Sequence, residues 1–206
     1  MRFFSRTFVV IARLESFAMA WSRTTRHAGL VAVCGTVMAC KSAGGAEPSP
    51  PPGMTVATIA VTSHAFSEGG PIPVDHGCDG KDTFPGVIWS APPPGTRSLT
   101  LIVDDPDAPG GTFTHFIAFN LSPDLRALRE GTDPGKEGAR LGRNGFDAIG
   151  YNGPCPPKGE EHHYRFTLYA LDTQLRASEG AKRNDIEQSM NGHLLGQGTL
   201  TGRFGH

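Results

Sequence analysis

Short runs of alternating apolar and polar residues follow one another from residue 55 onward, and Gly- and Pro-rich turns separate them. This spacing predicts strands at 55–62, 84–90, 97–105, 112–121, 164–172 and 198–204. In the two clearest runs, alternation is expected to place these residues on one face of each strand: Phe113, His115, Ile117, Phe119 and Leu121 in the first, and Tyr164, Phe166, Leu168 and Ala170 in the second.

Helical signals are fewer than strand signals. Ser122 followed by Pro123 predicts the start of a short helix. A second helix is predicted to begin at Asn184 or Asp185 and to carry one apolar stripe, formed by Ile186, Met190 and Leu194. The chain also holds 27 Gly and 17 Pro among 206 residues, which favours turns over long helices. We therefore predict an antiparallel β-sandwich with a few short peripheral helices.

The N-terminal 39 residues are predicted to be an export signal. Residues 28–39 are apolar and uncharged, and they follow Arg23 and Arg26. This run is too short to cross a bilayer, which needs about 20 residues, so it fits the apolar part of a signal peptide. Cys40 follows the run directly, which resembles a bacterial lipoprotein signal whose cysteine becomes the lipidated first residue. The alternative is an ordinary signal peptide that is cleaved nearby.

The remaining chain divides into a tether and one domain. Residues 1–18 fit a signal poorly because charges interrupt them, and we hypothesise that translation starts at Met19. Residues 40–54 are rich in Gly, Ser and Pro and are predicted to be a tether. Residues 55–206 then form the folded domain. This organisation predicts a periplasmic or cell-envelope lipoprotein that meets a membrane only through a lipid anchor at Cys40.

The net charge and the absence of several motifs argue against some classes of function. The formal net charge of −1 argues against a protein that binds nucleic acid through a basic surface. The sequence has no G-x-S-x-G, no H-E-x-x-H, no phosphate-binding P-loop and no dinucleotide fingerprint. We therefore expect no enzyme activity and no cofactor.

Three polar segments stand out among the predicted strands. They are D-D-P-D-A-P at 104–109, T-H-F at 114–116, and G-P-C-P-P-K-G-E-E-H-H-Y at 153–164. Taken singly, each is compatible with turn chemistry or with a hydrogen-bonded core histidine. Taken together, acids at the end of one strand and histidines on two others are expected to converge at one end of the sandwich. His162 and His163 should point to opposite faces, so only one of them can reach this site.

The same side chains are also candidates for a metal site. Asp105, Asp107, His115 and His162 are acceptable metal ligands by type. Their spacing matches no particular metal, so no metal is predicted.

At these same residues the sequence resembles the phosphatidylethanolamine-binding protein family, also called the Raf kinase inhibitor protein family. Within that family it is similar to the bacterial branch described as Raf kinase inhibitor-like. The resemblance extends over residues 60–204. It rests on these pieces: D-P-D-A-P at 105–109, T-H-F-I-A-F-N-L at 114–121, G-P-C-P-P-K-G-E-E-H-H-Y-R-F-T-L-Y-A-L at 153–171 and H-L-L-G-Q-G-T-L-T-G-R-F at 193–204.

The resemblance implies a β-sandwich with a small preformed pocket that binds anions such as the phosphate of phospholipid head groups. Carried over residue by residue, the pocket comprises Asp105, Asp107, His115, Pro157, Gly159, His162 and Tyr164. Thr114 stands where the family often has a further His, and His163 stands where it often has Arg. The resemblance also implies a sharp turn at 105–109, for which we expect a cis Ala108–Pro109 bond.

These observations predict a non-enzymatic protein that captures a small anionic or phosphorylated ligand. The two Asp are expected to orient the imidazoles and favour their protonated form, while His, Tyr and backbone donors hold the anion. The alternative is a protein-interaction module that inhibits a protease or kinase through the loops at 105–112 and 153–162. A hydrolase has less support, because the sequence offers no identifiable nucleophile.

Two cysteines remain in the predicted exported domain. They are Cys78 and Cys155, an even number in an oxidising compartment, where thiols tend to pair. A bridge between them would stiffen the pocket loop. The alternative is two separately buried small apolar side chains.

Overall fold

The structure is a computed structural model, and it describes residues 47–205. It contains two sheets packed face to face, with strand order β1-β9-β8-β4-β5-β7 in the larger and β2-β3-β6 in the smaller. All neighbours are antiparallel except β1 and β9. The strands are β1 (Ala57–Thr58), β2 (Val61–Thr62), β3 (Val87–Trp89), β4 (Ser98–Asp105), β5 (Phe113–Leu121), β6 (Ala127–Leu128), β7 (Arg140–Leu141), β8 (Glu161–Leu171) and β9 (Leu194–Gly205). This confirms the predicted antiparallel sandwich.

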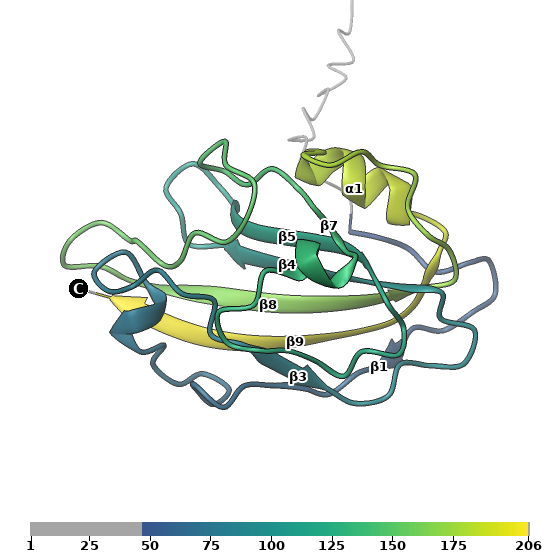
Figure 1. Cartoon of the computed structure of the whole chain (residues 1–206), viewed down its shortest axis with the longest axis horizontal. Coiled ribbons are helices and arrows are strands. Elements are labelled where there is room, and N and C mark those ends of the chain that lie inside the picture. The colour runs from purple at the N-terminus through teal and green to yellow at the C-terminus, as the bar shows by residue number, and fades with distance from the viewer. Residues whose placement is uncertain (1–46, 206) are drawn as a thin grey trace, which may run out of the picture. The chain divides into compact units, whose positions relative to one another are not determined.

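Helices are short and peripheral, as predicted. They are the 3-10 turns η1 (Val74–His76) and η2 (Pro134–Glu137) and the α-helix α1 (Arg183–Met190). Figure 1 shows α1 and β3 on opposite sides of the larger sheet. Within residues 47–205, no helix is long and apolar enough to cross a membrane.

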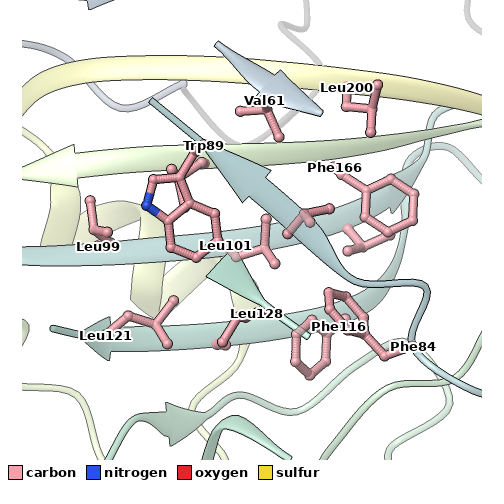
Figure 2. Close-up of a cluster of buried hydrophobic side chains, with 14 of the residues drawn as sticks. Val61, Phe84, Trp89, Leu99, Leu101, Phe116, Leu121, Leu128, Phe166 and Leu200 are labelled. Carbon is pink, nitrogen blue, oxygen red and sulfur yellow. The ribbon is translucent and has the colours of Figure 1, made fainter. Parts of the chain in front are cut away.

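The main core lies between the two sheets. Aromatic rings from both sides meet there, with Phe84 and Phe116 5.4 Å apart between centroids, and Trp89 is buried in another part of the same cluster, near Leu99 and Leu101 (Figure 2). Burial of each such ring stabilises the fold by about 2–3 kcal/mol. A second cluster lies on the outer face of the larger sheet, where α1 packs through Ile186 and Met190. Every residue of β4 is buried because both of its faces are covered.

β8 follows the predicted alternation. Tyr164, Phe166, Leu168 and Ala170 all belong to the core between the sheets. The strand pairs with β9 without interruption from Glu161↔Gly205 to Ala170↔Gly196. His162 therefore shares the inward face of β8, and it lies at the open end of the sandwich.

The single face predicted for 113–121 is wrong, because two irregularities interrupt the strand. Val103 pairs with Phe116 while Asp104 pairs with Thr114, so His115 is an extra residue in β5. A second extra residue lies near Asn120, which has a φ of 57°. Bulges of this kind re-aim side chains. Phe116 and Ala118 consequently face the smaller sheet, and Ile117 and Phe119 face α1.

Two other expectations need correction. The predicted strand at 55–62 is divided, because β1 joins the larger sheet and β2 the smaller one. The predicted helix after Ser122 is a turn followed by β6, and the Trp89 Nε1–H donates to the Leu125 carbonyl at 2.9 Å, which holds that turn. The second helix is confirmed, although Leu194 belongs to β9.

The Ala108–Pro109 bond is trans, so the expected cis bond is wrong: no peptide bond in residues 47–205 is cis. Two turns with trans bonds reverse the chain instead. The Asp107 N–H donates to the Asp105 carboxylate at 2.8 Å, and the Gly111 N–H donates to the Ala108 carbonyl at 2.9 Å. Aspartate commonly bonds the backbone two residues on in this way.

Candidate functional site

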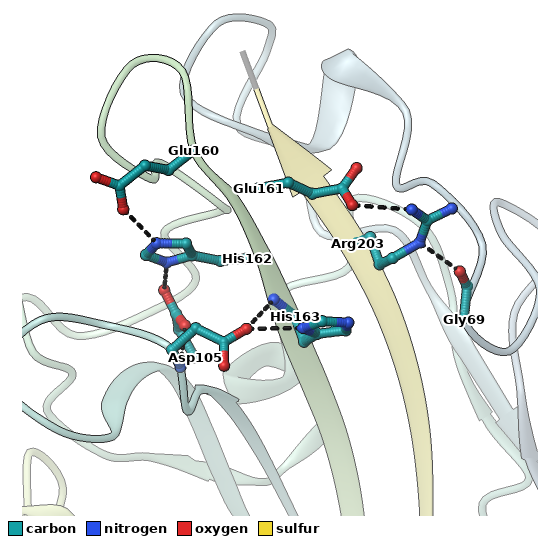
Figure 3. A network of polar contacts seen from close by, with 8 residues as sticks. Gly69, Asp105, Glu160, Glu161, His162, His163 and Arg203 are labelled. Atoms are coloured by element: carbon teal, nitrogen blue, oxygen red, sulfur yellow. Dashed lines mark hydrogen bonds and ion pairs between the residues drawn. The ribbon is translucent and has the colours of Figure 1, made fainter.

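A cluster of polar side chains forms where β4 ends and where β5 and β8 begin. Asp105 is the last residue of β4, His162 is the second residue of β8, and His115 is the bulge residue of β5. His162 Nδ1–H donates to Asp105 Oδ2 at 2.7 Å, as Figure 3 shows. Both side chains are 5% exposed. The buried carboxylate therefore fixes the orientation of the His162 ring.

The second ring nitrogen of His162 contacts a carboxylate as well. Nε2 lies 3.2 Å from Glu160 Oε2 (Figure 3), and the Glu160 side chain is 56% exposed. The hydrogen bond to Asp105 raises the pKa of His162, Glu160 adds to this, and burial opposes it. With an acceptor on each side, the protonated ring can donate from both nitrogens.

His115 is held differently. Its Nδ1–H donates to the Asn152 carbonyl at 2.8 Å, which leaves Nε2 as the acceptor of a neutral ring. The rings of Phe113, Phe146 and Tyr164 surround it edge-on, at centroid distances of 5.2, 5.6 and 5.2 Å. This burial lowers the pKa of His115. The site therefore combines one histidine that favours charge with one that favours neutrality.

Tyr164 supplies a hydroxyl beside His115. The side chain is fully buried, and its hydroxyl makes no hydrogen bond of standard geometry with residues 47–205. Burial raises its pKa, so the group stays protonated. The Asp105 carboxylate and the Cys155 backbone lie near this hydroxyl, so a ligand acceptor would compete with Asp105 for its proton.

Asp107 does not join Asp105 in this cluster. Its Oδ2 accepts from the His163 backbone N–H at 2.8 Å and lies 2.7 Å from His163 Nδ1. These bonds lower the pKa of Asp107. His163 points away from His162, as alternation predicted. Only Asp105 orients a pocket histidine, whereas Asp107 caps the edge of β8 on the exposed side.

Pro157 and Gly159 shape the loop that leads into β8. The Glu160 N–H donates to the Pro157 carbonyl at 3.0 Å, which closes a turn that requires the left-handed φ of 86° at Gly159. Both residues are exposed. They position Glu160 and His162 rather than contact the cluster themselves.

The same loop is joined to the segment around Cys78. Cys78 and Cys155 form a disulfide with their Cα atoms 5.4 Å apart, so the structure has the bridge rather than two separate thiols. Next to it the Cys78 N–H donates to the Pro154 carbonyl at 3.0 Å. The loop before β8 is therefore held at two adjacent points.

Sequence reasoning missed several supporting residues. Asn144 is buried, and its Nδ2 donates to Asn152 Oδ1 at 2.8 Å and to the Gly150 carbonyl at 3.1 Å. This contact steadies the backbone carbonyl that holds His115. Glu160 was also missed, because only the turn at Gly159 brings its carboxylate to His162. The signal for Asn144 was its place in a Gly-flanked turn, which does not reveal its partner.

A cavity of about 450 Å³ lined by His64, His76 and Leu128, among others, shares no lining residue with the polar cluster. Within residues 47–205, no group of three or more His, Cys, Asp or Glu side chains is arranged to hold a metal ion.

The profile of one protein family, phosphatidylethanolamine-binding protein, matches residues 62–205. The chain belongs to the phosphatidylethanolamine-binding protein family. This confirms the resemblance, and membership in the family supports a protein that binds a small ligand.

Relatives within the family include proteins from archaea and bacteria. A UPF0098 protein of Methanothermobacter thermautotrophicus is 43% identical over 145 residues, which cover 69% of this chain and 95% of the relative. LppC of Mycobacterium tuberculosis, whose name marks it as a candidate lipoprotein, is 39% identical over 71% of this chain and 72% of its own length.

Solved structures of family members have the same fold. A candidate family homologue from Chlamydia trachomatis, CT736, is 38% identical with a TM-score of 0.68, covering 74% of this chain and 99% of that one. YbcL of E. coli, described as a member of the mammalian family, is 29% identical with a TM-score of 0.67, covering 72% of this chain and 98% of that one.

The pKa values of the two pocket histidines should lie on opposite sides of the ordinary value of about 6.5. We expect NMR to show His162 titrating above that value and His115 below it, because Asp105 stabilises one charge and burial disfavours the other. Asp105→Asn should lower the His162 pKa, whereas the matched Asp107→Asn should leave it nearly unchanged. Equal pKa values for both rings would contradict this account of the site.

The same shifts define a dependence of stability on pH. Because the pKa of His162 is raised, His162 adds to the free energy of unfolding below about pH 6.5, and this contribution is lost as the pH rises through the folded-state pKa. The pKa of His115 is lowered, so the pH dependence is reversed. Its contribution to the free energy of unfolding is present above about pH 6.5 and is lost as the pH falls through the folded-state pKa.

Reduction of the Cys78–Cys155 bridge should lower the free energy of unfolding by about 2–4 kcal/mol, because the bridge restricts a long loop in the unfolded chain. Urea unfolding of oxidised protein and of a Cys78→Ala/Cys155→Ala double variant measures the difference. Two reactive thiols in denatured, unreduced protein would show that the bridge is absent.

Proposed function

We propose that this protein is a non-enzymatic binding protein that captures a small anionic or phosphorylated ligand at the cluster of Asp105, His115, His162 and Tyr164. One observation carries the proposal. His162 donates inward to a buried carboxylate and outward to an exposed one, and a ligand oxygen can replace only the exposed carboxylate.

The carboxylate in an anion site has a physical role in this scheme. Asp105 and protonated His162 together have almost no net charge, so the pair does not repel a phosphate as an isolated carboxylate would. Asp105 also accepts from Nδ1, which directs Nε2–H outward. An arriving anion must then displace only the exposed carboxylate of Glu160.

The other two groups favour a phosphorylated ligand. The Tyr164 hydroxyl is a donor, and Nε2 of neutral His115 is an acceptor. A hydrogen phosphate has oxygens that accept and one O–H that donates. A charged histidine and a neutral one therefore complement the two kinds of oxygen on this ion. Inhibition of a protease or kinase through the neighbouring loops stays a prediction.

Binding should depend on pH and on the carboxylate that competes with the ligand. Calorimetry with inorganic phosphate and O-phosphoethanolamine should show affinity falling as pH rises past the raised pKa of His162. Glu160→Gln should raise phosphate affinity about two- to fivefold, the range of an exposed ion pair. His162→Gln should lower it at least tenfold, whereas the neighbouring control His163→Gln should not.

Two results would count against the proposal. One is phosphate affinity that stays constant from pH 5 to 8 after correction for the ionisation of phosphate itself. The other is equal loss of affinity in His162→Gln and His163→Gln, which would place binding outside this cluster.

We also infer that the protein is exported and anchored at Cys40, which lies outside the described residues. The uncharged run at 28–39 and the cysteine that follows it support this. The relationship to LppC supports it as well.

Anchoring is tested on the protein expressed from its full gene. Detergent-phase partitioning should recover it with lipid, and mass spectrometry should find a modified cysteine at the N-terminus of the mature chain. Cys40→Ala should move the protein to the aqueous phase, whereas the control Cys34→Ala should not. A mature chain that begins at another residue would contradict anchoring at Cys40.

A further inference from the structure

A second polar cavity lies on the outer face of the larger sheet. Its volume is about 190 Å³, and its walls include Asp104, Arg165, Thr167, Tyr169, Arg183 and Glu187. Asp104 and Arg165 directly adjoin Asp105 and Tyr164 along their strands, and successive strand residues point to opposite faces. The sheet itself therefore separates this cavity from the candidate anion site.

The basic residue of α1 in this cavity is already bonded. Arg183 Nε donates to Glu187 Oε1 at 2.8 Å, and its Nη1 donates to Asp104 and, at 3.2 Å, to Thr114 Oγ1. Thr114 Oγ1 also donates to Asp104 at 2.9 Å. These bonds fix the positions of Asp104 and Glu187, and they leave the Arg183 guanidinium less able to bind a ligand.

One carboxylate oxygen and one guanidinium in the same cavity make no such hydrogen bond. Glu187 is 6% exposed, and its Oε2 has no hydrogen-bond partner among residues 47–205. A buried carboxylate oxygen without a donor is costly. Arg165 also lines the cavity, where it interacts electrostatically with the Asp104 carboxylate, but its guanidinium makes no hydrogen bond with residues 47–205. The cavity thus offers one acceptor and one cation to a bound molecule.

We propose that this cavity binds a small zwitterion the size of a small amino acid, with its ammonium on Glu187 Oε2 and its carboxylate on Arg165. The charged side chains that line the cavity are the acidic Glu47, Asp104 and Glu187 and the basic Arg165 and Arg183. Their charges nearly balance, which suits a ligand without net charge. A molecule with only one charge would bind to only one of the two groups, Glu187 Oε2 or the Arg165 guanidinium.

Size and polarity agree with this ligand. At about 30 Å³ per water, the volume corresponds to about six waters, close to the six or seven non-hydrogen atoms of alanine or serine. Burial raises the pKa of Tyr169 to about 12, so its hydroxyl stays protonated and can donate. Thr167 adds a further hydroxyl to the wall. Such a lining is unsuited to an acyl chain, which would leave the hydroxyls without partners.

The test is calorimetry or NMR titration of the purified protein with L-serine, methylammonium and acetate as probes. Serine should bind at least tenfold more tightly than either singly charged probe. Glu187→Gln should weaken serine binding at least tenfold, because the amide no longer offers a carboxylate oxygen to the ammonium. Arg165→Met should do the same through the carboxylate. Glu137→Gln, on the exposed surface, is the matched control and should change nothing.

Several outcomes would overturn the proposal. They are no serine binding at 100 mM, equally tight binding of methylammonium or acetate, and serine affinity that survives both substitutions. Thermal unfolding checks that Glu187→Gln is folded, and if it is not, Arg165→Met decides alone. Saturating inorganic phosphate should leave serine affinity unchanged. His162→Gln should also leave it unchanged, so failure here is separate from failure of the anion site.

Discussion

β4 pairs with β8 residue by residue, from Ser98↔Leu171 to Asp104↔Arg165, and this register determines where all the chemistry described above is placed. On the inner face the register aligns the core, and Asp105, one residue beyond its end, accepts a hydrogen bond from His162. On the outer face the register brings Asp104 beside Arg165. A slip of one residue would exchange the two faces, so the apolar core that fixes the register also fixes both polar sites.

The buried contact between Asp105 and His162 illustrates how such a site is supported. Removing two charges from water is costly, and their attraction compensates only when the remaining donors and acceptors are also satisfied. Here Asp105 Oδ1 accepts from the Asp107 N–H, and His162 Nε2 meets Glu160. The pair is therefore complete without a ligand, yet one of its contacts is exposed and exchangeable. This arrangement permits binding without leaving an uncompensated buried charge.

Much of the fold follows from strict alternation in the sequence. In β8 each second residue is apolar and no residue is inserted, so the inward face could be assigned from the sequence alone. In β5 the same reasoning failed, because extra residues near His115 and Asn120 shift the alternation without any change in residue type that reveals them. The family motif nonetheless located His115, since a motif records position and not orientation.

The site shows the same division between local and long-range information. The turn at Gly159 and the opposite directions of His162 and His163 are local properties, and the sequence predicted where those histidines point. The partners of Asp107, Glu160 and Asn144 depend on how separate segments meet. No spacing rule within one segment could supply them. The carboxylate expected to orient a second histidine therefore caps a strand edge instead.

The loop before β8 connects the site to the compartment in which the protein is predicted to work. Residues 155 and 157–160 are exposed, so burial of apolar surface does little to hold them. Their position depends instead on the bridge from Cys155 to Cys78 and on the adjoining contact between Pro154 and Cys78. A bridge of this kind persists where thiols are oxidised. Export to an oxidising compartment, as predicted, would therefore maintain the disulfide that holds Glu160 and His162 close to Asp105.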